Sequence, residues 1–397
     1  MAAITPPKYV RQILFTLQVH GYPAYLVGGC VRDLLMEKRP HDWDICTAAL
    51  PEQVQSLFPV TRPTGLQHGT VTVVIGSKQV EVTTFRTEGG YADHRHPDRV
   101  SFVGELTEDL GRRDFTMNAI AVSADGLLAD PYGGVEDIRA RRIRCVGEAE
   151  TRFEEDALRM LRALRFSAKL GFTIEIGTLL AIQAKAPLAA GLAAERVREE
   201  LEKLLLSDAP ETIYAVMDLG LIDSFLRDRP GQPTFWRRLR RLPRKALYRW
   251  AGFAIGLQRL GCIASVEDFL RAMKLDNRSI RCCTAAERLL REPLPATPHA
   301  WKKALRALDV PSVSCAACVS DALYGGQSMK ALRAVLRSGE CFSLKHLAVT
   351  GDDLLILGLK GRAIGEMLNF LLDYVMEYPE NNNRDLLMSL AGGGSEE

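Results

Sequence analysis

Two aspartates near the N-terminus have the residue type and the spacing of a metal-binding pair. Asp42 and Asp44 stand at positions i and i+2 of the segment His41-Asp42-Trp43-Asp44-Ile45. On a strand, both carboxylates would point to the same face, about 7 Å apart, and Trp43 and Ile45 to the other. Two like charges so close repel each other, and Mg²⁺ would relieve the repulsion because it takes oxygen ligands from one or two carboxylates plus phosphates. An Asp-x-Asp pair by itself is more often simply solvated.

A glycine pair upstream of these aspartates predicts a phosphate-binding turn. Gly28-Gly29 follows the short apolar run 24–27 and precedes a predicted helix over 32–36. Glycine lets the backbone approach a phosphate closely, and a helix N-terminus favours negative charge. Arg32 would reach the same phosphates. Glycine pairs are common in tight turns, so this motif alone is a weak indication.

A third acidic residue, Glu81, lies downstream in the alternating run 80–85. On a strand its side chain points away from the face that carries Val80 and Val82. Glu81 is either a third carboxylate beside the metal ions or a solvated glutamate on an edge strand, and the sequence favours neither interpretation.

The segment 155–165 places acidic and basic residues at helical spacing. On one continuous helix the polar side is formed by Glu155, Arg159 and Arg162, flanked by Asp156 and Arg165. The apolar residues then face the core. Asp156 would present a hydrogen-bond acceptor one turn from the donor fork of Arg159. The alternative is a solvated helix face that carries Glu–Arg pairs.

An acceptor beside a donor fork matches two of the four RNA bases. Cytosine and adenine each offer an amino donor beside a ring-nitrogen acceptor, whereas uracil and guanine offer a carbonyl beside an N–H. A mispaired buried polar group costs about 1–3 kcal/mol. Two such mispairings would favour cytosine and adenine by about a hundredfold or more.

The elements that position these residues change in character near residue 140. Before it, we expect helices over 8–20 and 51–58, strands over 24–27 and 42–46, and a hairpin of 71–75 with 79–85. After Arg139, helical periodicity dominates, at 151–170, 179–186, 193–206, 210–219, 265–274 and 362–376. The predicted fold class is α+β, a mixed-sheet head followed by an all-α remainder.

Composition narrows the class of protein without deciding it. The chain has 397 residues and a formal net charge of +2, so any nucleic-acid surface must come from local clusters of basic residues. Two such clusters are 139–144 and 236–245, and for each a charged face that touches only water is an equal alternative. The N-terminus lacks a signal-peptide pattern and no apolar run approaches the roughly 20 residues of a membrane span. We therefore expect a cytoplasmic protein with no membrane partner.

The nine cysteines do not suggest a disulfide framework. Cys315-x-x-Cys318 is the only metal-like spacing, and it is more typical of small residues packed in a helix. The metal site of a linked phosphohydrolase domain would need a histidine followed later in the chain by a His-Asp pair. The only His-Asp pair is His41-Asp42, within the predicted metal-binding segment, so such a domain is not evident.

Together, the motifs resemble a known family. Gly28-Gly29-x-x-Arg32-Asp33 followed by Asp42-x-Asp44 is similar to the polymerase-β-like nucleotidyltransferase superfamily. Arg112-Arg113-Asp114-Phe115-Thr116-Met117-Asn118-Ala119 and Glu155-Asp156-x-x-Arg159 resemble motifs of class II tRNA CCA-adding enzymes of the bacterial type. The likeness is dense over the first 170 residues and loose beyond them.

The resemblance implies an activity and a set of site residues. The activity is template-independent addition or repair of the 3′-terminal CCA of tRNA from CTP and ATP, by two-metal transfer with Mg²⁺. The resemblance implies that Asp42 and Asp44 are catalytic and hold the metal, and Glu81, taken from the strand pattern, is the third candidate catalytic residue. The implied nucleotide-binding residues are Gly28, Gly29, Arg32, Arg113, Asp114, Asn118, Asp156, Arg159, Arg162 and Arg165.

The resemblance also implies a division into a head (1–140), a neck (141–205), a body (206–292) and a tRNA-binding tail (293–397). The polar segment 89–99 matches a loop that the family needs for the switch to A addition. Poly(A) polymerase or partial CC- or A-adding activity remains an alternative, as does a non-catalytic RNA-binding module. The oligomeric state is left open.

Overall fold

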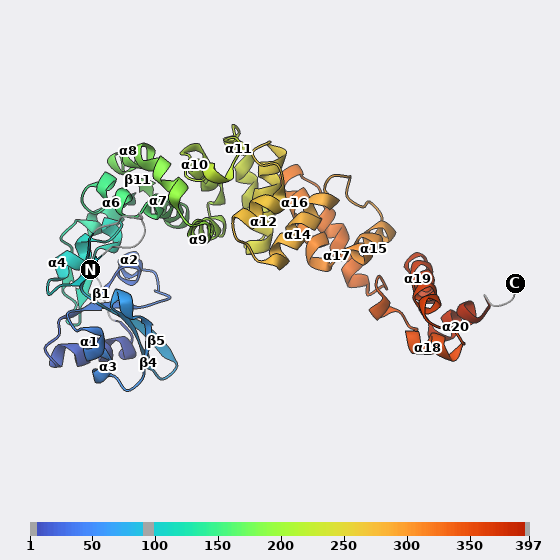
Figure 1. Ribbon diagram of the computed structural model, residues 1–397, viewed down its shortest axis with the longest axis horizontal. Coiled ribbons are helices and arrows are strands. Elements are labelled where there is room, and N and C mark those ends of the chain that lie inside the picture. The colour runs from blue at the N-terminus through green and yellow to red at the C-terminus, as the bar shows by residue number, and fades with distance from the viewer. Residues whose placement is uncertain (1–5, 90–98, 394–397) are drawn as a thin grey trace. The chain divides into compact units, whose positions relative to one another are not determined.

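The computed structural model describes residues 6–89 and 99–393. The chain forms two compact units, Met1–Ser224 and Phe225–Glu397. The first unit contains the sheet and the second is helical (Figure 1). The α+β fold class predicted from the sequence is therefore confirmed, whereas the finer division into head, neck, body and tail stays a prediction.

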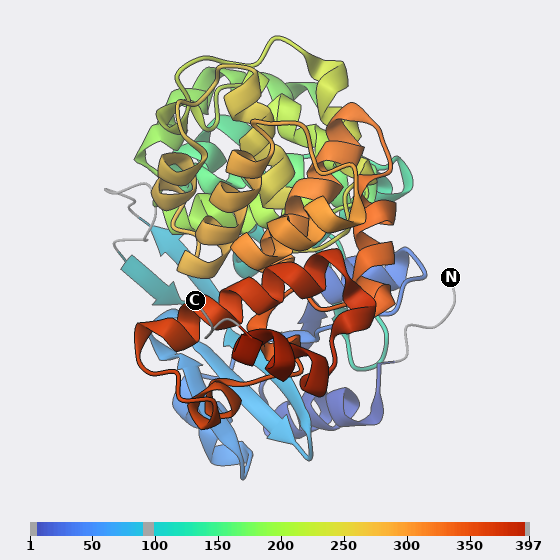
Figure 2. The same cartoon turned by 90° about the vertical axis from the view of Figure 1, so that its right-hand side faces the viewer.

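A seven-stranded mixed sheet forms the core of the first unit. Its strand order is β3-β4-β5-β2-β1-β8-β9. The strands are β1 (Ala24–Val27), β2 (Asp44–Thr47), β3 (Thr61–Gly65), β4 (Thr70–Ile75), β5 (Lys78–Thr84), β8 (Ala121–Ser123) and β9 (Leu128–Ala129). Only β2 and β5 run parallel, and the other neighbours are antiparallel. The predicted hairpin is β4–β5, closed at Ile75 and Lys78 (Figure 2).

The second strand begins later than the sequence suggested. We expected a strand over 42–46, but β2 starts at Asp44, and Asp42 lies in the preceding bend. The reason is that the ladder of β2 with β5 begins with the pair Asp44 and Glu81, and the ladder with β1 lies further along. The prediction that Asp42 and Asp44 share one face of a strand was therefore wrong for Asp42.

Helices complete the first unit. They are α1 (Lys8–Val19), α2 (Gly29–Leu35), α3 (Pro51–Leu57), α4 (Leu106–Gly111), α5 (Gly134–Arg139), α6 (Ala149–Glu155), α7 (Leu158–Leu170), α8 (Ile176–Lys185), α9 (Ala194–Leu205) and α10 (Ile213–Asp218). Helices α1 and α3 pack against each other and against the sheet (Figure 1). Proline opens α3 because its fixed φ suits the first helical turn.

The helix expected over 151–170 is interrupted. Helix α6 ends at Glu155 and α7 begins at Leu158, with Asp156 in an extended conformation between them. The Asp156 carboxylate accepts the Leu158 backbone N–H at 3.1 Å. An aspartate that caps a backbone donor in this way competes with continuation of the helix. The predicted one-helix arrangement of Asp156 and Arg159 was therefore wrong, although both residues stay close in the chain.

Four short strands lie outside the main sheet. β10 (Arg142–Ile143) pairs with β11 (Thr173–Ile174), so the region after Arg139 is not entirely helical. β6 (Arg86–Gly89) pairs with β7 (Arg99–Phe102). Residues 90–98 of the polar segment expected over 89–99 lie outside the described residues.

The second unit consists of packed helices. They are α11 (Pro233–Trp236), α12 (Ala246–Arg259), α13 (Val266–Ala272), α14 (Asn277–Leu289), α15 (Pro298–Ala307), α16 (Val310–Tyr324), α17 (Ser328–Ser338), α18 (Gly351–Ile356), α19 (Arg362–Glu377) and α20 (Arg384–Gly392). Cys315 and Cys318 are buried in α16, which packs on α14. No helix among the described residues is long and apolar enough to cross a bilayer.

The two basic clusters are partly tied to the protein itself. Arg142 and Arg144 both pair with the fully buried Asp137, at 2.6 and 2.8 Å. In the second cluster, Trp236 is buried and Arg238 donates to the Leu323 carbonyl. Neither cluster is therefore a row of arginines that face only solvent.

Candidate active site

The glycine turn lies where the end of β1 meets the start of α2. Gly28 has a φ of 78°, a conformation that costs other L-residues free energy. A Cβ at this position would lie 3.2 Å from Arg113 Nη1 and 3.8 Å from Asp44 Oδ2. The turn thus needs glycine both for its backbone and for the close approach of Arg113 and Asp44.

Three carboxylates concentrate negative charge beside this turn. Asp44 is half-buried on β2, Glu81 is its exposed Cα partner on β5, and Asp42 is exposed in the preceding bend. Burial and the charges of Glu81 and Asp42 raise the pKa of Asp44 to about 6, against the opposing effect of Arg113. A carboxylate whose ionisation is disfavoured in this way is stabilised by a bound cation.

The carboxylate oxygens of this group suit a divalent cation that is ligated partly by the protein and partly by the phosphates of a substrate. The described residues contain no group of three or more His, Cys, Asp and Glu side chains arranged to hold a metal by themselves. Mg²⁺ is usually held by one or two carboxylates plus substrate phosphates, so such a cage is not required. Asp42 and Asp44 are the residues that would hold the ion, with Glu81 beside them.

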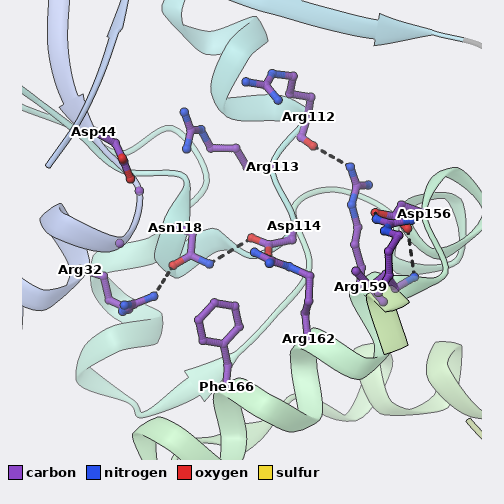
Figure 3. Close-up of a pocket in the computed structure, with 14 residues that line it drawn as sticks. Arg32, Asp44, Arg112, Arg113, Asp114, Asn118, Asp156, Arg159, Arg162 and Phe166 are labelled. Atoms are coloured by element: carbon purple, nitrogen blue, oxygen red, sulfur yellow. Dashed lines mark hydrogen bonds and ion pairs between the residues drawn. The ribbon is translucent and has the colours of Figure 1, made fainter. Parts of the chain in front are cut away.

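One buried carboxylate anchors two neighbouring arginines. Asp109, in the first turn of α4, is fully buried and pairs with Arg112 at 2.8 Å and Arg113 at 3.0 Å. Burial would raise the pKa of Asp109, but the two guanidinium groups outweigh it and lower the pKa. Figure 3 shows Arg113 extended towards Asp44. Asp109 was not predicted as a site residue, because its spacing to Arg112 and Arg113 is that of an ordinary surface helix pair.

A hydrogen-bonded chain joins α2 to α7 through the segment 114–118. Arg32 donates to Asn118 Oδ1 at 2.7 Å, and Asn118 Nδ2 donates to Asp114 Oδ1 at 3.0 Å. Arg162 donates two hydrogen bonds to the other carboxylate oxygen, Asp114 Oδ2, from Nε at 2.9 Å and from Nη2 at 2.6 Å. Burial would raise the pKa of Asp114, but Arg162 and Asn118 lower it to about 2. The four predicted residues therefore form one network.

The aromatic ring of Phe166 lies against three arginine side chains. Its ring lies 5.3 Å from the Arg32 guanidinium carbon, 5.5 Å from that of Arg162 and 3.9 Å from that of Arg165. In Figure 3 the ring lies between Arg32 and Arg162. A phenylalanine on an amphipathic helix normally indicates core packing, so the sequence offered only its position one turn after Arg162 as a signal.

Asp156 and Arg159 are held by separate partners. Arg159 donates to the Arg112 carbonyl at 3.0 Å (Figure 3). It also pairs with Glu155 at 2.6 Å. Asp156 pairs with Arg196 of α9 at 2.8 Å. The Glu155–Arg159 pair, which belonged to the alternative interpretation of this segment, is thus present. It restrains the Arg159 side chain.

These groups line one open pocket of about 450 Å³, called here the arginine-lined pocket (Figure 3). Its size is within the range of small-molecule sites. Ten predicted residues line it: Gly28, Gly29, Arg32, Asp44, Arg113, Asp114, Asn118, Asp156, Arg159 and Arg162. Four lining residues were not predicted: Arg112, Leu158, Phe166 and Arg196.

Three predicted residues do not line this pocket. Asp42 and Glu81 are exposed beside Asp44. Arg165 is buried against Glu200 and the ring of Phe166. Arg165 therefore stands behind the pocket wall, where it supports Phe166.

The arrangement suits the transfer of a nucleotide. Six arginines against three aspartates make the pocket cationic, as a triphosphate requires, and Asp44 connects it to the acidic group with Asp42 and Glu81. A mixed sheet with carboxylates at β2 and β5 and a glycine turn after β1 defines the class: the chain is a nucleotidyltransferase of the polymerase-β-like superfamily.

Comparison with known proteins narrows this class. Residues 24–144 match the family "Poly A polymerase head domain", and residues 171–231 match "Probable RNA and SrmB-binding site of polymerase A". The chain is 42% identical to the CCA-adding enzyme of Geobacillus sp. (strain WCH70), over 86% of this chain and 85% of that protein. It is 38% identical to the CCA-adding enzyme of Limosilactobacillus fermentum, over 96% of each chain.

A solved structure agrees with these relatives. The crystal structure of the Bacillus stearothermophilus CCA-adding enzyme in complex with CTP is 36% identical and superimposes with a TM-score of 0.82, covering 98% of each chain. The chain therefore belongs to the family of CCA-adding enzymes.

Proposed function

We propose that this protein adds or repairs the 3′-terminal CCA of tRNA, using CTP and ATP and releasing pyrophosphate. One observation carries the proposal: the base-reading candidates Asp156 and Arg159 line the same pocket as the glycine turn and Asp44. A single cavity thus brings an acceptor–donor pair and a phosphate-binding turn to the acidic group. The family match and the CTP complex of the B. stearothermophilus relative support this assignment.

Base selection follows from the hydrogen-bonding groups of the pocket. Asp156 accepts a hydrogen bond from the amino group that cytosine and adenine share, and Arg159 donates a hydrogen bond to the adjacent ring nitrogen. Arg159 is fixed for this role because it also binds Glu155 and the Arg112 carbonyl. Uracil and guanine would mispair at both positions, at a cost of about 1–3 kcal/mol each.

The chemical step joins RNA to nucleotide. The RNA 3′-oxygen forms a bond to the α-phosphorus of CTP or ATP, and the bond to the pyrophosphate oxygen breaks. Gly28 and Gly29 let the backbone approach the triphosphate, while Arg32 and Arg113 offset its charge. Asp114 and Arg162 border the space for the sugar. The protein contributes mainly position and electrostatic stabilisation.

Mg²⁺ is the cofactor that suits this acidic group best. Asp42 and Asp44 would hold it and Glu81 is the third candidate. When bound, the ion supplies charge stabilisation and makes the attacking hydroxyl more acidic. Oxygen-only ligands favour Mg²⁺ over softer metals.

The other predictions from the sequence complete the proposal. Residues 141–205 form the neck that carries the nucleotide-selecting segment, 206–292 the body, and 293–397 a tail that binds tRNA. The protein acts in the cytoplasm, where its tRNA substrate is. Poly(A) polymerase or partial CC- or A-adding activity is the second candidate, since residues 24–144 match the poly(A) polymerase head domain family.

The test is nucleotide incorporation on a tRNA that ends at its discriminator base. We expect CTP alone to add two residues, CTP with ATP to add three and then stop, and ATP alone to add none. The Asp42→Ala variant should bind tRNA but add nothing. A long tract of A from ATP alone would establish the poly(A) alternative, and equal use of UTP or GTP would refute the selection mechanism.

A further inference from the structure

Arg196 lines the arginine-lined pocket although nothing in the sequence set it apart. It is the third residue of α9, in the segment predicted only as an amphipathic helix. Its Nη2 pairs with Asp156 Oδ2 at 2.8 Å, across 40 residues of chain. Its Nη1 is buried and has no hydrogen-bond partner in the described part of the protein.

A buried N–H without an acceptor costs free energy, so such groups in native proteins need an explanation. Arg196 borders the arginine-lined pocket of about 450 Å³, and the unpartnered atom belongs to the same guanidinium that binds Asp156. An acceptor on a bound ligand would satisfy the Nη1 donor.

The Asp156 carboxylate depends on a partner to fix its direction. Its backbone is extended between α6 and α7, so no helix holds the residue. One carboxylate oxygen accepts the Leu158 N–H at 3.1 Å and the other receives Arg196. Without Arg196 the side chain would keep one of these two restraints and would turn more freely.

We propose that Arg196 is a positioning residue for nucleotide selection: it orients Asp156 as the acceptor of the base amino group and donates its Nη1 to the incoming nucleotide. The inference rests on the proposed function. It predicts that Arg196 acts on the choice among nucleoside triphosphates, rather than on the acidic group that performs the transfer.

The experiment measures kcat/KM for CTP, ATP, UTP and GTP on a tRNA acceptor, for the full-length protein and the variants Arg196→Gln and Arg196→Lys. Losing one restraint on Asp156 and one ligand contact should lower kcat/KM for CTP and ATP about tenfold. UTP and GTP should change little, so the preference for C and A should fall by the same factor. Arg196→Lys should be intermediate because it keeps the charge and loses the planar fork.

Arg198→Gln is the matched control, since Arg198 lies on the same helix, does not line the pocket and pairs with Glu199. It should keep the wild-type preference. An equal loss with all four nucleotides, or no loss at all, in Arg196→Gln would overturn the inference, and a thermal melt close to wild type would show that the variant is folded. Failure of the wild-type protein to add C or A would instead refute the proposed function.

Discussion

Asp44 and Glu81 are Cα partners on the parallel strands β2 and β5, so two acidic residues from distant segments face one another at the start of the shared ladder. The charge of Glu81 also raises the pKa of Asp44. This relationship favours the interpretation of Glu81 as part of the acidic group over that of an isolated solvated side chain.

Replacing Glu81 by Gln tests that interpretation. We expect kcat to fall at least about tenfold, because residues next to a metal site typically contribute 10- to 100-fold to activity or metal affinity. The required Mg²⁺ concentration should also rise, and titration of activity with Mg²⁺ measures it. Glu52→Gln, an exposed glutamate in α3, is the control. Unchanged kcat and Mg²⁺ dependence in Glu81→Gln would show that Glu81 is merely solvated.

Replacing Gly28 by Ala should weaken nucleotide binding. The new Cβ would lie 3.2 Å from Arg113 Nη1 and push that side chain away from Asp44. Arg113 would then lose one charge-assisted hydrogen bond to the triphosphate, worth about 1.5 kcal/mol. This loss corresponds to roughly a tenfold higher KM for CTP. Gly126→Ala is the matched control, because Gly126 has a φ of +85° but no atom within 4 Å of the added Cβ. Equal effects of both changes on KM would mean that backbone strain, and not Arg113, is responsible.

Replacing Phe166 by Leu should affect the triphosphate more than the fold. The leucine loses the ring that faces the guanidinium groups of Arg32 and Arg162. Each cation–π contact is worth about 0.5–2 kcal/mol. We expect KM for CTP to rise about tenfold. Phe172→Leu removes a ring of similar burial that lies outside the pocket, and it should lower the melting temperature without changing KM. If both variants keep the wild-type KM, Phe166 is only a core residue.

Asp114 should make folding stability depend on acid pH. Its pKa is lowered from 3.8 to about 2, because Arg162 and Asn118 outweigh the effect of burial. A carboxyl whose folded pKa is lowered stabilises the folded state above its unfolded pKa, and this stabilisation is lost as the pH falls towards the folded pKa. The contribution is on the order of 2 kcal/mol above about pH 4.

The measurement is urea unfolding of the wild type and of Asp114→Asn between pH 3 and 7. The variant should be less stable at pH 5 to 7, and the difference should shrink as the pH falls below 4. The exposed Asp125→Asn serves as the control. A difference that stayed constant with pH would show that the ionised Asp114 is not the stabilising form.

Local patterns predicted much of the fold. The run 24–27 became β1 and the hairpin became β4–β5, because period-2 alternation and turn residues act within a few residues. The same patterns failed where a side chain competed with the backbone. The segment 151–170 has helical periodicity, but the helix breaks at Asp156 because the Asp156 carboxylate accepts the backbone N–H of Leu158.

The sequence by itself determined the chemical groups: the acidic pair, the glycine turn and the arginines follow from residue type and spacing. Only the tertiary structure decided which of them meet. Asp109 anchors two arginines, Phe166 lies against three, and Arg196 reaches Asp156 from another helix. The spacing of Asp109 to its two arginines is visible in the sequence, but its complete burial is not. The contacts of Phe166 with Arg32 and of Arg196 with Asp156 join segments far apart in the chain, and no pattern within one segment encodes them.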